Sequence, residues 1–275
     1  MMKNRLKITT LGILSLSFAG LMLSSCFDDP EFPDEPRITF ESLRYVSQAT
    51  SGAIVDSLIL TIAFEDGDGD LGLDNDENDA PYNPRHYFSN KTGTFLNRQT
   101  ESPEDVLVLS NRAEIDTLPE FNPDIDGCLF WVVEPTDLEV VDVTTGDRAP
   151  LNDTVYYQLN ERHNNIYVRF FTDGANDQPE DGEIDEATEE VNFRTINLPQ
   201  CDPGYDGRFP ILSDDLNESS ALEGTIEYSM VQAGPFSDES FFGNRLTKLR
   251  IYILDRAGNR SNIVETEPFR LSDIN

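Results

Sequence analysis

Apolar residues alternate with polar ones over much of the chain, and one stretch shows this most clearly. Every second position from 58 to 64 holds a large apolar side chain: Leu58, Leu60, Ile62 and Phe64. Successive side chains of a β-strand point to opposite faces, so this period predicts a strand with one buried face. Directly after it the chain becomes rich in aspartate and glycine, which predicts a loop.

Shorter apolar stretches bounded by turn residues predict further strands. They lie at residues 37–41, 106–109, 129–133, 138–141, 155–159, 166–171, 191–196, 224–228, 249–254 and from 262 onward. No stretch of ten or more residues combines helical periodicity with capping residues. Many strands and little helix predict an all-β fold, a β-sandwich rather than an alternating α/β fold.

The first 25 residues predict a bacterial lipoprotein signal peptide. Basic residues near the start precede an uncharged apolar run, Ile8 to Leu23, that is too short for a stable membrane span. Leu23-Ser24-Ser25-Cys26 resembles the lipobox at which such signals are cleaved, and Cys26 then carries the lipid. An ordinary signal peptide with an incidental cysteine is the alternative.

Residues 26–36 predict an extended tether, because they contain several prolines and no apolar periodicity. The run Phe27-Asp28-Asp29-Pro30-Glu31 resembles the export signal that sends lipoproteins of Bacteroidota-type bacteria to the cell surface. These features predict attachment to the outer membrane through the lipid anchor, with exposure at the cell surface. Residues 37–275 are then expected to form the folded body.

The chain is strongly acidic, with 52 Asp and Glu residues against 20 Lys and Arg and a formal net charge of −32. Such a field repels nucleic acid, which is therefore a poor candidate partner, and attracts divalent cations. A hydrophobic content of 38%, with 17 Phe and 9 Tyr residues, suffices for a core and argues against disorder.

The chain contains three cysteines. With Cys26 assigned to the lipid, Cys128 and Cys201 remain as a possible disulfide pair outside the cytosol. Two buried free thiols are the alternative, because nothing in the sequence sets the distance between them.

The acidic loop after the 58–64 strand is the first candidate for a metal site. Calcium takes six to eight oxygen ligands, and an EF-hand loop supplies them from positions 1, 3, 5, 7, 9 and 12. Counted from the end of the strand, carboxylates stand at five of these positions: Asp66, Asp68, Asp70, Asp74 and Glu77. Leu71 stands where an EF-hand needs glycine, and no helix flanks the loop, so a true EF-hand is disfavoured. An EF-like calcium loop within a β fold and a merely solvated acidic loop are both open.

A second candidate lies near the C-terminus, in the turn Asp255-Arg256-Ala257-Gly258-Asn259. If 58–64 is the second strand of an immunoglobulin-like sandwich and 249–254 the penultimate one, both loops lie at the same end. Asp255 and Asn259 would then reach the acidic loop, and one Ca²⁺ would neutralise the repulsion among the carboxylates. A purely structural turn, with Asp255 bonding local backbone amides, is the alternative.

The strand before the acidic loop, the segment Gly224-Thr225-Ile226 and the closing run from Asp255 to Asn262 resemble a family of Bacteroidota outer-membrane lipoproteins with an immunoglobulin-like β-sandwich. The resemblance covers the signal, residues 37–73 and about 204–273. It implies an early strand pair, a long β-rich elaboration at about 75–205, and a return of the chain to complete the sandwich. It implies an architecture and a cellular address, but no activity.

Signals for catalysis are weak. His86 and His163 lack metal-ligand spacing, and no serine or cysteine motif marks a nucleophile. The abundance of acidic residues offers too many carboxylate pairs to single one out for glycoside hydrolysis. Trp131, Tyr156 and Tyr157 could line a sugar-binding face, although aromatic residues in strands more often belong to the core.

The sequence therefore predicts a surface-exposed lipoprotein that acts as a non-catalytic binding or structural module, is stabilised by Ca²⁺, and has an unknown protein or glycan ligand. A glycan-binding component of a surface nutrient-capture system is the first alternative, and it requires an exposed aromatic platform. A secreted hydrolase is the second, and it requires a cleft with carboxylates at catalytic separation.

Overall fold

The structure is a computed structural model. It describes residues 31–50, 53–96, 105–108, 110, 130–132, 139–141, 148–150, 154–191, 193, 204–213, 215–216, 219–233 and 243–274. The expected signal peptide, Cys26, Cys128 and Cys201 lie outside these residues, so lipidation and the disulfide stay predictions. Phe32–Asn275 forms one compact unit.

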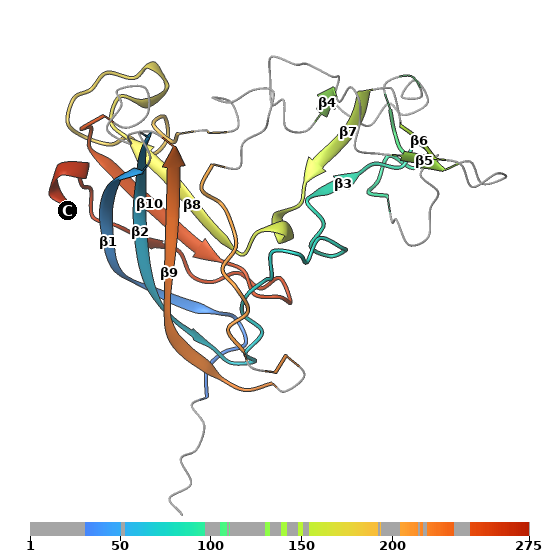
Figure 1. Ribbon diagram of the computed structural model, residues 1–275, viewed down its shortest axis with the longest axis horizontal. Coiled ribbons are helices and arrows are strands. Elements are labelled where there is room, and N and C mark those ends of the chain that lie inside the picture. The colour runs from blue at the N-terminus through green and yellow to red at the C-terminus, as the bar shows by residue number, and fades with distance from the viewer. Residues whose placement is uncertain are drawn as a thin grey trace, which may run out of the picture. The chain divides into compact units, whose positions relative to one another are not determined.

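Three long antiparallel strands form the first sheet, in the order β1-β2-β9 (Figure 1). The strands are β1 (Arg37–Thr50), β2 (Ala53–Asp66) and β9 (Leu222–Ala233). The predicted alternation holds in β2, where the large apolar side chains of 58–64 are buried and the residues between them are half-buried. Because β2 ends at Asp66, the first acidic residue of the loop is also the last residue of a central strand.

The second sheet has the order β11-β10-β8 and is also antiparallel. Its strands are β8 (Ile166–Thr172), β10 (Thr247–Ile253) and β11 (Val264–Glu265). Buried residues alternate with half-buried ones along β10, as its sequence predicts. β10 leads within two residues into the turn at Asp255.

Both sheets contribute to one hydrophobic cluster. Its fully buried members include Leu60 and Ile62 from β2, Phe170 from β8, and Leu249 and Ile251 from β10. Burial of one side chain of this size stabilises a fold by about 1.5–3 kcal/mol. The antiparallel sheets confirm the predicted all-β class.

A third sheet has the order β3-β7-β4, and a separate strand pair joins β5 to β6. The bounds are β3 (Arg85–Tyr87), β4 (Phe130–Val132), β5 (Glu139–Val141), β6 (Arg148–Pro150) and β7 (Thr154–Leu159). A hydrophobic cluster of its own supports the third sheet: Tyr87, Val106, Val108, Val155 and Tyr157.

Residues 75–205, the expected elaboration, do not form a self-contained insertion. They contain β8, which belongs to the second sheet and to the main core. The predicted strand at 191–196 is wrong at Phe193, whose backbone is helical. The ring of Phe193 packs edge-on against Phe170, with 5.6 Å between centroids, so its apolar side chain covers the core from a connecting segment.

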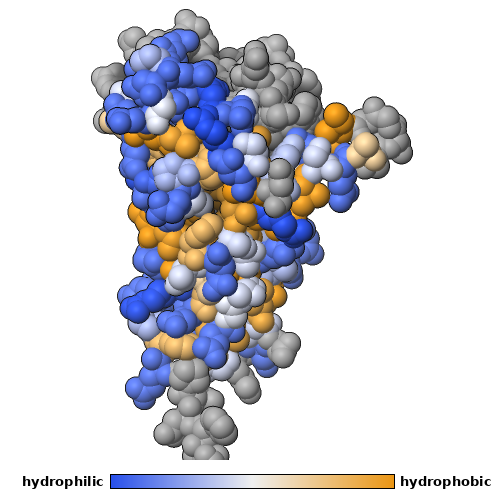
Figure 2. Space-filling model, turned by 90° about the vertical axis from the view of Figure 1, so that its left-hand side faces the viewer, coloured by the Kyte–Doolittle hydropathy of each residue, from blue (hydrophilic) through white to orange (hydrophobic). Residues whose placement is uncertain are grey.

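The remaining regular elements described are short 3-10 helices: η3 (Glu161–His163), η4 (Ala175–Asp177) and η5 (Leu271–Asp273). No helix among the described residues has the length and apolarity needed to span a bilayer. On the face shown in Figure 2, hydrophobic residues reach the surface in several places between hydrophilic ones. This mixture is typical of antiparallel sheets with one face in the core and the other toward solvent.

Candidate metal centre

The acidic loop is held against the main core by apolar and glycine residues that alternate with its aspartates. Leu71 and Leu73 are buried, and each forms a backbone hydrogen bond with the segment 209–212. Gly69 and Gly72 have φ values of 72° and 107°, a conformation that favours glycine. A Cβ at either glycine would also collide with neighbouring backbone. The loop therefore has one fixed course.

The turn 255–259 is built around the carboxylate of Asp255. Its Oδ1 accepts the backbone N–H groups of Gly258 at 2.6 Å and Asn259 at 2.7 Å. Its Oδ2 accepts the side-chain amide of Asn259 at 2.7 Å. Gly258 has a φ of 95°. The structural role expected for this turn is therefore present, whether or not Asp255 also binds a metal ion.

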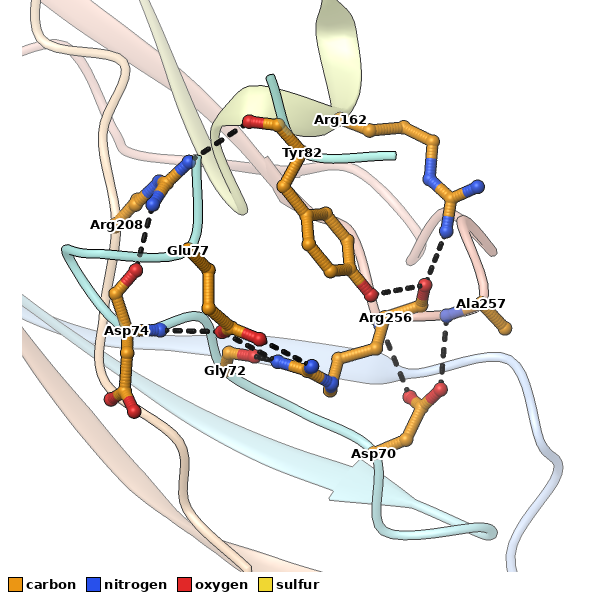
Figure 3. Close-up of polar contacts among 9 residues, drawn as sticks. All are labelled: Asp70, Gly72, Asp74, Glu77, Tyr82, Arg162, Arg208, Arg256 and Ala257. Atoms are coloured by element: carbon orange, nitrogen blue, oxygen red, sulfur yellow. Dashed lines mark hydrogen bonds and ion pairs between the residues drawn. The ribbon is translucent and has the colours of Figure 1, made fainter. Parts of the chain in front are cut away.

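The structure brings the two loops together. The backbone amides of Arg256 and Ala257 donate to the two carboxylate oxygens of Asp70, at 3.2 and 2.9 Å (Figure 3). One carboxylate oxygen from each of Asp66, Asp70 and Asp255 lies within 4.8 Å of the others. Carboxylates from the end of β2 and from the turn after β10 thus face a common point.

Two carboxylate oxygens of the acidic loop are buried without a hydrogen-bond donor among the described residues. They are Oδ1 of Asp66, a residue with 0% exposure, and Oδ1 of Asp68. A buried acceptor with no partner costs about 1–3 kcal/mol, and more when it is charged. A cation at the point shared by Asp66, Asp70 and Asp255 would supply the missing partner for the Asp66 oxygen.

Burial and mutual repulsion raise the pKa values of these carboxyl groups. The pKa of Asp66 rises to about 7, mainly through burial and then through the charges of Asp68, Asp70 and Asp255. The pKa of Asp70 rises to about 6 through burial and the charges of Asp255 and Asp68. Burial also raises the pKa of Asp255. Near neutral pH the group must therefore take up protons or a cation.

Glu77 and Asp74 do not join this group. Both oxygens of Glu77 accept hydrogen bonds from the guanidinium of Arg256, at 2.6 and 2.8 Å, and this cation lowers the pKa of Glu77. Asp74 is exposed, and its backbone N–H donates to Glu77 at 2.8 Å. Asn259 orients Asp255 through its amide. The EF-hand-like spacing is thus realised over Asp66–Asp70 only.

Sequence reasoning missed the basic residues around the site. Arg256 also donates to the carbonyl of Gly72, at 3.2 Å. Arg208 donates to the carbonyls of Asp74 and Tyr82, at 2.7 and 3.3 Å (Figure 3). The only available signal was an arginine next to Asp255 in an acidic chain, and it did not reveal which acidic residue the arginine would pair with.

The candidate metal ligands are all oxygen atoms, which suit hard cations such as Ca²⁺ and Mg²⁺ and disfavour zinc or copper. Asp66, Asp68, Asp70 and Asp255 provide up to four carboxylates, a strongly anionic set. The aromatic platform considered for sugar binding loses Tyr156 and Tyr157, since both are buried. Only the backbone of Trp131 is described, so nothing follows for its side chain.

Comparison with known proteins adds no relative: no protein-family model, no curated protein and no solved structure matches the chain.

Proposed function

We propose that this protein is a surface-exposed lipoprotein whose body is an immunoglobulin-like β-sandwich stabilised by Ca²⁺, acting as a non-catalytic binding or structural module. One observation carries the calcium part of the proposal. The buried Oδ1 of Asp66 has no hydrogen-bond donor among the described residues, and the carboxylate of Asp66 converges with those of Asp70 and Asp255. A cation resolves the repulsion and the missing bond together.

Calcium fits this group better than magnesium. Ca²⁺ accepts flexible sets of carboxylate and carbonyl oxygens, whereas Mg²⁺ requires near-ideal octahedral geometry and keeps several waters. Four carboxylates, two of them nearly or fully buried, favour an ion that sheds its water readily. The ligands come from segments far apart in the chain, since Asp70 and Arg256, the residue after Asp255, are 186 positions apart. An ion bound there therefore stabilises the folded chain and not the unfolded one.

The cellular address rests on the sequence. The basic start, the apolar run and the cysteine at position 26 support a lipid anchor in the outer membrane, and the acidic residues after Cys26 support surface exposure. The tether that joins the anchor to the body would then end at about residue 31, before the expected residue 36, because Phe32–Asn275 forms one compact unit. A protein or glycan is the proposed ligand class.

Thermal unfolding of the purified protein in Ca²⁺ and in EDTA tests the calcium site. Calcium at 100 times its Kd should stabilise the folded state by about 2.7 kcal/mol, which raises the melting temperature by several degrees. Asp66→Asn should abolish this rise. In EDTA, however, Asp66→Asn should melt above the wild type, because it removes one of the repelling charges.

Asp76→Asn is the matched control, since it makes the same change at an exposed position of the neighbouring acidic stretch. It should keep the full calcium response. A wild-type protein whose melting temperature is the same in Ca²⁺ and EDTA would overturn the proposed site.

A further inference from the structure

Arg256 lies between the proposed ion site and the third sheet. Its backbone N–H and that of Ala257 donate to the carboxylate of Asp70. Its carbonyl oxygen accepts hydrogen bonds from the hydroxyl of Tyr82, at 3.1 Å, and from the guanidinium of Arg162. Figure 3 shows both sets of bonds on the same short peptide segment.

Tyr82 and Arg162 stand at the same end of the third sheet, where Arg85 of β3 pairs with Leu159 of β7. Tyr82 comes just before β3, and Arg162 lies in η3, just after β7. The ring of Tyr82 lies between two guanidinium groups, 5.1 Å from the central carbon of Arg256 and 5.6 Å from that of Arg162. The segment before β3 and the segment after β7 are therefore both attached, at one end of the sheet, to a single carbonyl group of the turn 255–259.

Asn160 joins these two segments into one unit. Its side-chain amide donates to the carbonyls of Pro81 and Asn83, both at 2.7 Å. Its side-chain oxygen accepts the backbone N–H of Arg162 at 3.0 Å. A displacement of the Arg256 carbonyl would therefore disturb the attachment of both segments together.

The charges at the ion site affect the position of this carbonyl, because the turn that carries Asp255 also carries Arg256. Without a cation, the carboxylates of Asp66, Asp68, Asp70 and Asp255 repel one another, and the repulsion falls if the turn moves away from the acidic loop. That movement breaks the bond between Asp70 and the amide of Arg256 and displaces the carbonyl of the same residue. A bound cation attracts Asp70 and Asp255 to one point and holds the turn in place.

Building on the proposed calcium site, we propose that ion binding controls how firmly the third sheet is attached to the main core. In this proposal the turn 255–259 takes one position with the ion bound and another without it. Arg256 transmits the position of the turn to Tyr82 and Arg162. Coupling between two sites is reciprocal, so the hydrogen bonds at the Arg256 carbonyl also strengthen ion binding. Because of this reciprocity, a substitution next to the third sheet that removes no proposed ligand should still change the calcium affinity.

Tyr82→Phe tests it by removing one hydrogen bond at the Arg256 carbonyl without altering a proposed ligand. A neutral hydrogen bond shifts an equilibrium by about twofold to tenfold, so calcium affinity should fall by roughly threefold. Tyr228→Phe is the matched control, because its hydroxyl also donates to a carbonyl, that of Tyr205 at 3.0 Å. Tyr228 lies in β9, and its loss should leave the affinity unchanged.

Two measurements on the purified protein complete the test: calcium titration by calorimetry, and hydrogen exchange with and without calcium. Calcium should slow amide exchange in residues 80–87 and 154–163 as well as in the ligand loops. In Tyr82→Phe this protection at 80–87 should be reduced even at saturating calcium.

The outcomes separate the two proposals. If calorimetry shows calcium binding, but exchange at 80–87 and 154–163 does not respond and Tyr82→Phe binds as the wild type does, the attachment proposal is overturned and the calcium site stands. If the wild type binds no calcium, the calcium site is overturned and the attachment proposal falls with it.

Discussion

The two acidic loops of this protein treat their buried carboxylates in opposite ways. In the loop at 173–189, Asp173 and Glu189 are each 3% exposed, comparable to the 0% of Asp66. Each of their four carboxylate oxygens accepts a backbone N–H, from Asp181, Gly182, Gly174 and Asp185, at 2.7–3.0 Å. In the first loop, oxygens of Asp66 and Asp68 have no such donor within the described residues.

The difference teaches that a high density of acidic residues does not identify a metal site. The second loop uses carboxylates as internal acceptors that organise its own backbone, and it is complete without a cation. The first loop donates the backbone N–H of Asp70 to Oδ2 of Asp66, at 3.2 Å, but leaves Oδ1 of Asp66 without a donor and negative charge concentrated at one point. What distinguishes the two loops is whether each buried oxygen has a donor.

The largest loss of stability is expected from Asp173→Ala, which tests whether the second loop depends on its own carboxylates as acceptors. It leaves two backbone N–H groups without their charged acceptor, so stability should fall by about 3 kcal/mol. The loss should be equal in Ca²⁺ and in EDTA, as measured by urea unfolding. Glu183→Ala, an exposed change in the same loop, should have an effect below about 0.5 kcal/mol. A loss confined to calcium-containing buffer would contradict the contrast between the loops.

An intermediate effect is expected from pH in the absence of metal. The pKa values of Asp66 and Asp70, about 7 and about 6, lie above the usual value of 3.8, so the folded state binds these protons more tightly than the unfolded state does. The resulting stability is fully present below pH 3.8 and is lost as pH rises through 6 and 7. Melting scans in EDTA between pH 5 and 8 should therefore show a fall of several degrees.

Calcium should largely remove this pH dependence, because the cation replaces the protons as the partner of the carboxylates. Asp66→Asn should flatten the profile in EDTA, which separates the site from the general effect of the acidic surface. An EDTA profile of the same slope in Asp66→Asn and in the wild type would assign the fall to that surface instead.

The smallest effect is expected from Glu77→Gln, which tests where the first loop stops resembling a calcium loop. The structure pairs Glu77 with Arg256, a partly exposed ion pair, so the change should cost about 0.5–1 kcal/mol in either buffer. If Glu77 were a ligand, as its spacing alone suggests, calcium affinity should fall by tenfold or more. Calcium titration of the variant distinguishes the two roles.

Local pattern predicted much of the fold, but not the partners of side chains far apart in sequence. The alternation at 58–64 correctly predicted β2 and the start of the acidic loop, because a period of two depends only on local geometry. Counting along the loop also suggested Glu77 as a ligand, yet Arg256 lies 179 positions away and takes its carboxylate. No spacing within the loop contains that information.

The same limit explains why local pattern did not predict the roles of Leu71, Asp173 and Asp255. Leu71, which departs from the EF-hand pattern, is a fully buried anchor that holds the loop on the core. The backbone amides that bond the carboxylate of Asp173 belong to Asp181 and Gly182, 8 and 9 positions further along the chain, and no local pattern reveals that pairing. Asp255 was found only by combining a turn motif with an assumed strand order.

The distance along the chain between Asp70 and Arg256 has a consequence for the order of folding. Bringing together residues 186 positions apart costs about 4–5 kcal/mol of loop-closure entropy, so this contact forms late. An emerging chain presents Asp66, Asp68 and Asp70 long before β10 and its turn exist to complete the group. The ion would therefore stabilise only a chain that has been made at least as far as Asp255, and a polypeptide truncated before Asp255 would carry the first half of the site without the second.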